Sequence, residues 1–258
     1  NMNAEQIKLL EETIDHKNSK IPVALIADSP WIPGYCGHTF MDYYARNDVW
    51  MADNRKIRKD FPEAAFVPGW WVEYGMVAEP SGFGCPTCYF DDNLPHLHPL
   101  TEDLDKAEEI FKNLQIPDPK IDGIMPFLLN QQRLYQPQLE ADGDEVYMVC
   151  ARGPFTVASH IFTVTQLLML MMINPEAADV LLQKTTKIVK LWLEAQLENV
   201  KTANRRRIKE ATEKYNSFLR CMQKCPEGKP FGSFLYESLY YKPVKHCQKR
   251  NSDQREKS

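Results

Sequence analysis

Residues 145–200 read EVYMVCARGPFTVASHIFTVTQLLMLMMINPEAADVLLQKTTKIVKLWLEAQLENV and carry the densest structural signal in the chain. An apolar run at residues 146–150 lies between two turn dipeptides, Asp142-Gly143 and Gly153-Pro154, which is typical of a strand buried on both faces. Proline suits the first turn of a helix, because its missing N–H would have no partner there. The pattern therefore predicts a buried strand followed at once by a helix.

A second helix is expected to begin after Asn174. Asparagine is a favoured N-cap residue, and Pro175 and Glu176 suit the turn that follows it. Apolar residues then recur at helical spacing, at Val180, Leu181, Ile188, Val189, Leu191, Trp192, Leu193 and Leu197. A buried strand, a sharp turn and two consecutive helices indicate an α/β unit of the barrel or doubly wound type.

Three parts of this stretch resemble the uroporphyrinogen decarboxylase (URO-D) superfamily: ARGPFTVASHIF at 151–162, NPE at 174–176 and WLEAQLE at 192–198. The similarity extends from about residue 21 to about residue 200. The resemblance implies a TIM-type (β/α)8 barrel and one of two chemistries. These are decarboxylation of uroporphyrinogen side chains in porphyrin biosynthesis, and corrinoid-linked methyl transfer to a thiol.

Charge divides the 258-residue chain near residue 200. Residues 1–200 carry a net charge of −13 and residues 201–258 one of +9. The overall charge of −4 favours neither nucleic acid nor an anionic membrane as a partner. Seven cysteines and no recognisable secretory signal predict reduced thiols in a cytoplasmic protein. The longest apolar run, residues 167–173, is far shorter than the ~20 residues that span a bilayer, so we expect a buried helix there.

The pattern along the chain predicts only part of a barrel. An amphipathic helix at 3–15 precedes strands at 21–27, 63–71 and 146–150 and a doubtful strand at 87–90, whereas a closed barrel needs eight. Helices are expected at 39–46, about 49–59, 104–114 and 126–135. The predicted domains are thus an N-terminal helix (1–20), the N-terminal half of a barrel (21–200), and a charged helical extension with an irregular basic tail (201–258). Exposed strand edges of an incomplete barrel would favour self-association.

The decarboxylase pattern departs at each position that can be compared. Its substrate-binding arginines, in a run like PVWxMRQAGR, correspond to Ala27 and Trp31. The acid expected after the second strand is missing between Phe66 and Val72, and the tyrosine expected after Gly153-Pro154 is replaced by a run leading to His160. Uroporphyrinogen decarboxylation is therefore the less favoured of the two activities that the resemblance implies.

The resemblance is closer to the methyltransferase-like branch, which implies a small-molecule substrate, zinc, a corrinoid and a corrinoid protein as partner. Members of this branch activate the acceptor thiol on zinc held by a His-x-Cys pair and a distant Cys. Those ligands lie beyond the part of the barrel that this chain resembles, and the tail offers only the adjacent His246-Cys247. A third alternative is a truncated chain without catalytic activity.

Candidate site residues follow the first two strands, where barrel enzymes build their sites. Asp28 is a candidate catalytic acid, or else a turn acceptor before Ser-Pro. Candidate substrate-binding residues after the same strand are Trp31, Tyr35 and His38. Trp70, next to Trp71 after the second strand, either packs in the core or forms a pocket wall for a planar ligand.

Two more candidates flank the turn after the third strand. Arg152 would anchor an anion beside the helix N-terminus, or else pair with an acid on a neighbouring strand. His160 is a candidate general acid or base, or else a core histidine.

A weaker pattern suggests a metal site. Cys85 and Cys88 precede His96 and His98, and four such ligands within 14 positions are compatible with tetrahedral zinc, although a structural loop is the favoured interpretation.

Overall fold

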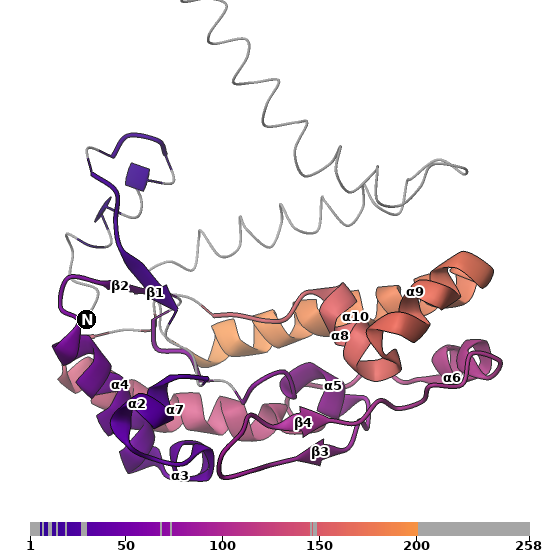
Figure 1. Ribbon diagram of the computed structural model, residues 1–258, viewed down its shortest axis with the longest axis horizontal. Helices are drawn as coiled ribbons and strands as arrows, with labels where there is room; N and C mark the ends of the chain where they lie inside the picture. Colours follow the sequence, from indigo (N-terminus) through magenta and orange to yellow (C-terminus); the bar gives the residue numbers. More distant parts are fainter. Residues whose placement is uncertain are drawn as a thin grey trace, which may run out of the picture. The chain divides into compact units, whose positions relative to one another are not determined.

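The computed structural model describes residues 6, 8–9, 12–13, 15–18, 20–26, 30–67, 69–72, 74–144, 146 and 149–200 (Figure 1). All of them belong to one compact unit, residues 1–204. In chain order its elements are β1 (Ala24–Ile26), α2 (Ile32–Cys36), α3 (Phe40–Ala45), α4 (Asn47–Asp60), β2 (Ala65–Val67), α5 (Ala78–Gly82), β3 (Thr87–Cys88), β4 (His96–Leu97), α6 (Ala107–Asn113), α7 (Met125–Ala141), α8 (Pro154–Phe162), α9 (Val164–Ile173) and α10 (Pro175–Asn199). The tail predicted at 201–258 lies outside the described residues.

A parallel strand pair forms the first α/β unit. β1 and β2 run parallel, with Leu25 opposite Phe66, and α2, α3 and α4 connect them. This is the crossover that parallel strands require. The short strands β3 and β4 form a separate antiparallel hairpin in which Cys88 lies opposite His96.

The predicted helices are present, with shifted ends. α3 is capped by Thr39, whose hydroxyl accepts the backbone N–H of Asp42 at 3.0 Å in a capping box. α4, α6 and α7 correspond to the helices expected at 49–59, 104–114 and 126–135. Of the helix expected at 3–15, residues 6, 8, 9, 12 and 13 are described and helical.

α8 and α10 begin at the positions that Pro154 and Asn174 indicated in the sequence. Pro154 occupies the first turn of α8, and the side chain of Asn174 accepts the backbone N–H of Ala177 at 3.1 Å to cap α10. α10 packs against α8, α9, α6 and α7, and Figure 1 shows this long helix crossing the helical part of the molecule. Its apolar stripe, including Leu181, Ile188 and Trp192, is buried in these contacts.

The strand predicted at 146–150 is not found among its described residues, 146, 149 and 150. Val146 and Val149 are buried as expected. However, the backbone carbonyl of Cys150 accepts a hydrogen bond from the side chain of Gln196 on α10, at 2.8 Å. A backbone group that a strand ladder would use is thus bound by a helix side chain instead.

The expectation of a buried helix at 167–173 is wrong for most of that run. Only Leu167 and Leu170 are buried on α9, whereas Met172 is 84% exposed and Ile173 65% exposed. α8 and α9 meet at Thr163, whose positive φ of 53° bends the chain, so α9 contacts α8 and α10 along one side. No single described helix is long and apolar enough to cross a bilayer. The pair α8 and α9 together has the length and composition of a membrane-spanning segment, but the two helices are bent by 99° relative to each other.

Candidate functional site

The candidate site forms where the segment after β2 meets the segment before α8. The guanidinium of Arg152 lies over the ring of Trp71, 4.8 Å from its centroid, and Nη2 of Arg152 donates to the carbonyl of Gly75 at 2.9 Å. A cation–π contact of this kind attracts a guanidinium to the face of an indole. Two chain segments separated by about 80 residues are therefore joined at this point.

Glu79 on α5 provides a buried carboxyl group at the same place. Its side chain accepts the backbone N–H of Arg152 at 2.8 Å, and the residue is only 2% exposed. Burial raises the pKa of Glu79, while that hydrogen bond and the charge of Arg152 oppose the rise. A cavity of about 20 Å³ lies beside it, lined by Trp71, Tyr74, Glu79, Cys150, Arg152 and others. This volume suits about one water molecule.

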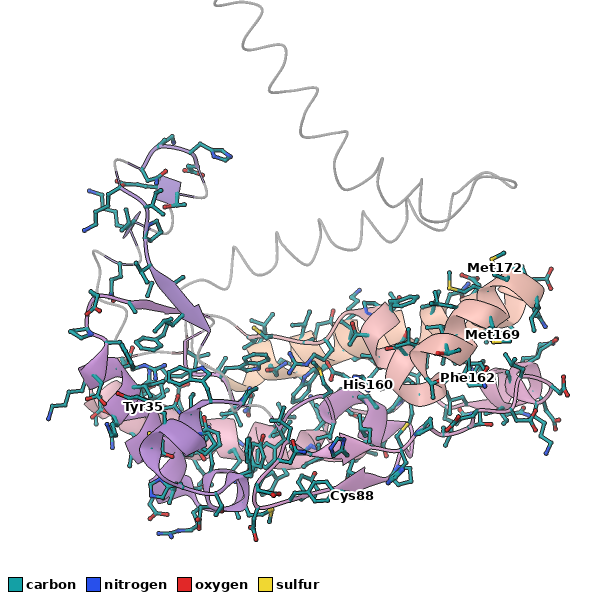
Figure 2. The ribbon with its side chains drawn as sticks, in the orientation of Figure 1. Tyr35, Cys88, His160, Phe162, Met169 and Met172 are labelled. Carbon is teal, nitrogen blue, oxygen red and sulfur yellow. The ribbon has the colours of Figure 1, made fainter. Side chains whose placement is uncertain are left out.

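His160 lies on α8, eight residues after Arg152, which precedes the helix. Burial lowers the pKa of His160, and the positive charge of Arg152 lowers it further. The imidazole is therefore held towards its neutral form, which can accept a proton. Figure 2 shows His160 on the α8 ribbon, distant from Tyr35 and Cys88, which lie on other elements.

Trp70 is placed in the core. It is 5% exposed, and its indole N–H donates to the carboxylate of Asp144. The guanidinium of Arg58 on α4 covers its ring at 3.9 Å. The two adjacent tryptophans thus contact different arginines.

Trp31 and Tyr35 form an aromatic cluster on the outside of α2. Their ring centroids are 5.9 Å apart, and Tyr35 lies 5.6 Å from Phe61. The phenol of Tyr35 donates to Asp60 at 3.0 Å, which raises the pKa of Tyr35. Lys56 lies 4.8 Å from the centroid of the same ring, so these side chains form an exposed network on α2 and α4.

His38 supports a buried carboxylate. Its Nδ1 lies 2.9 and 3.1 Å from the two carboxylate oxygens of Asp53, whose side chain is 2% exposed. Burial raises the pKa of Asp53, and the interaction with His38 opposes this rise. Asp28, the acid predicted after the first strand, lies outside the described residues.

The four suggested zinc ligands do not converge. Cys85 is buried, which raises the pKa of its thiol to about 11. Sγ of Cys88 lies 3.6 Å from Nε2 of His98, whereas His96 packs edge-on against Phe90 at 5.4 Å. Within the described part of the chain no group of three or more His, Cys, Asp or Glu side chains could hold a metal ion. The described residues therefore do not fit the zinc that the methyltransferase resemblance implies.

Among the predicted residues, His160 lies close enough to Arg152 for the charge of Arg152 to lower its pKa, and Trp31 and Tyr35 pack against each other. Glu79, Asp53 and Arg58 were not predicted from the sequence. Glu79 had a detectable signal, since an acid between Val77-Ala78 and Pro80 stands in an uncharged stretch. Asp53 and Arg58 stand among other charges on α4, where an exposed helix face looks the same.

Comparisons with known proteins fit this architecture. The chain is similar to a solved methyltransferase from Methanosarcina mazei, with 16% sequence identity and a TM-score of 0.56 over 74% of this chain. The match covers 55% of that methyltransferase, so the chain spans about half of its length. No curated protein matches the chain. The family model described as uroporphyrinogen decarboxylase (URO-D) matches residues 38–202, which is more than half of the sequence. The chain therefore belongs to the uroporphyrinogen decarboxylase family.

Proposed function

We propose that the chain is part of a methyltransferase-like enzyme of this family, and that Arg152 binds the anionic end of a small acceptor such as a thiol. The observation that carries the proposal is the stacking of Arg152 on Trp71, with His160 close enough for the charge of Arg152 to lower its pKa. Arg152 supplies a fixed positive charge, and Trp71 holds its guanidinium in place. His160, held towards its neutral form, is suited to accept the proton that an acceptor thiol loses.

The charge at this cavity favours methyl transfer over uroporphyrinogen decarboxylation. Arg152 is the one basic side chain among the described residues that line the cavity. Uroporphyrinogen carries carboxylates all round its macrocycle and needs several cations to hold it. Ala27 and Trp31 stand where decarboxylases have arginines, so one anionic group is a better match for this site.

A corrinoid would supply the methyl group, and we expect it to arrive on a separate corrinoid protein. The cavity beside Arg152 suits about one water molecule, so the anionic end of the acceptor would meet the half-buried guanidinium from its exposed side and would not lie inside the cavity. The part of the site proposed for this chain is the acceptor side: Arg152 holds the anionic end and His160 takes the thiol proton. The chain spans about half the length of the similar methyltransferase, and we expect turnover to need the barrel strands that this half does not include.

Two ligands with different charge test the proposal. We expect 2-mercaptoethanesulfonate, a thiol with a single anionic group, to bind the purified chain in a calorimetric titration, and uroporphyrin to bind at least tenfold more weakly. Tighter binding of uroporphyrin, or conversion of uroporphyrinogen to less carboxylated products, would support the decarboxylase alternative. Loss of methylcobalamin absorbance in the presence of the thiol would show that this chain alone transfers the methyl group. Thiol binding without that loss would support a chain that needs the rest of the barrel.

Self-association through strand edges is also proposed. Among the described residues β1 and β2 pair only with each other, which leaves an edge on each strand. Ile21 and Val23 beside β1 are 87% and 61% exposed. Analytical ultracentrifugation should detect dimers or larger species, and Val23→Lys should reduce them. A monomeric wild-type chain at high concentration would contradict this expectation.

A further inference from the structure

A second and larger pocket lies between α3, α5, β3 and the start of α7. Its volume is about 660 Å³, and its walls include Met41, Tyr44, Tyr74, Tyr89 and Phe127. Ligand pockets in proteins commonly measure about 300–1,000 Å³. The pocket is thus large enough for a molecule with one or two fused rings.

Aromatic rings shape this pocket in two orientations. Tyr44 and Tyr74 stack with their centroids 4.4 Å apart, and Phe127 meets Tyr74 edge-on at 5.5 Å. The phenol of Tyr74 donates to the carbonyl of Tyr44, so the stacked pair is fixed to the backbone. Faces and edges at nearly right angles can hold a planar ring by stacking on one wall and edge contact with another.

The pocket is uncharged. None of the described residues that line it is an Asp, Glu, Lys, Arg or His. Burial raises the pKa of both Tyr74 and Tyr89, so their phenols are neutral near pH 7. A charged ligand would lose hydration here without gaining a partner of opposite charge.

A tight turn fixes the wall between α5 and α7. Gly123 has a φ of +61°, and a Cβ there would overlap Ser81 and the backbone of Gly82. The next residue, Ile124, donates its backbone N–H to the hydroxyl of Ser81 at 3.0 Å. This contact ties the start of α7 to α5, and a wall held in place in this way reduces the ordering cost of binding.

We propose that this pocket is a binding site for an uncharged, planar aromatic molecule, separate from the Arg152 site. Tyr74 lines both the pocket and the small cavity beside Arg152 and forms the wall between them. A ligand in the pocket therefore contacts the aromatic side of this wall, while the acceptor site lies on the other. The inference does not depend on the proposed function.

A matched pair of fluorescent probes tests the proposal on the full chain. N-phenyl-1-naphthylamine and 1-anilinonaphthalene-8-sulfonate share a ring system and differ by one sulfonate. We expect the uncharged probe to bind at least tenfold more tightly. Phe127→Ala and Met41→Lys should each weaken its binding at least fivefold. Met41 lies 37% exposed on α3, so its replacement should leave the fold intact even if Phe127→Ala does not.

Two control variants separate the pocket from other apolar surface. Leu134 is 46% exposed on α7, two turns after Phe127, and does not line the pocket. Met172 lies on the exposed face of α9, as Figure 2 shows. Leu134→Ala and Met172→Lys should leave the affinity unchanged. The proposal is overturned if the sulfonated probe binds equally well, if the two pocket variants bind like wild type, or if Met172→Lys abolishes binding.

Discussion

Trp70 and Trp71 are neighbours in the sequence, and each stacks against an arginine, yet the two pairs differ in surroundings. Arg58 lies 3.9 Å from the Trp70 ring, and Arg152 lies 4.8 Å from the Trp71 ring. Arg58 is 8% exposed, and burial lowers its pKa to about 10. Arg152 is only half-buried and lines a cavity beside Glu79.

The difference shows that cation–π stacking alone does not identify a binding site. Trp70 is buried in the core, whereas the next residue, Trp71, lines the cavity beside Arg152. Arg58 donates to the carbonyl of Asn54 at 2.8 Å and fills space against Phe66. We interpret the Arg58–Trp70 pair as structural and the Arg152–Trp71 pair as the site for a ligand.

The largest expected effect is on the structural pair. Arg58→Ala removes the stacking on Trp70 and the hydrogen bonds to Asn54, and we expect it to lower the free energy of unfolding by about 3 kcal/mol. Urea denaturation measures this directly. Lys59→Ala, at the adjacent exposed position of α4, is the control and should change stability by less than about 0.5 kcal/mol. Equal effects of the two substitutions would contradict a structural role for Arg58.

A smaller change in the free energy of unfolding is expected from Glu79→Gln, and its size should depend on pH. Because burial raises the folded-state pKa of Glu79, its contribution to stability is fully present below the unfolded-state pKa of about 4.3 and is lost as pH rises through the higher folded-state value. Glu79→Gln should therefore gain stability relative to wild type as pH increases. Urea denaturation at pH values from below about 4.3 upwards measures how the free energy of unfolding changes with pH. The substitution Glu109→Gln, at an exposed position, is the matched control. A difference between Glu79→Gln and wild type that stays constant with pH would argue against this sign.

The contribution of His160 to stability should depend on pH with a sign opposite to that of Glu79. This dependence should be weaker, because His160 is only half-buried. Its pKa is lowered in the folded state, so its contribution is present above the unfolded-state pKa of about 6.5 and is lost as pH falls. Wild type should therefore lose stability relative to His160→Gln between pH 7 and pH 5. The same substitution at exposed His96 serves as the comparison in thermal unfolding. If acid destabilises both variants as much as wild type, burial of His160 is not responsible.

Helix boundaries were predictable from the sequence because proline and asparagine act locally. Pro154 and Asn174 mark the starts of α8 and α10, and the structure confirms both. The break at Thr163 was not predictable, since a threonine with positive φ has no glycine or proline signal. Because composition alone indicated a core helix, the exposure of α9 was not predicted. This exposure depends on the bend at Thr163.

The candidate site was predictable only in part, because its geometry depends on distant segments. Arg152 and His160 stand close in the sequence, and the charge of Arg152 reaches His160 as a consequence. The contribution of Glu79 depends on packing of α5 against the segment before α8, about 70 residues away. The suggested zinc ligands failed for a related reason: Cys85 packs inwards while Cys88 and His98 lie towards the surface.

The comparison of the two arginines leads to one decisive titration. The affinity for 2-mercaptoethanesulfonate would be measured by calorimetry for wild type, Arg152→Gln and Arg58→Met, with exposed Arg133→Gln as the control. The account predicts that Arg152→Gln weakens binding at least tenfold, which corresponds to about 1.4 kcal/mol, while Arg58→Met and Arg133→Gln bind like wild type. Unchanged binding in Arg152→Gln would contradict the assignment of this arginine to the ligand site.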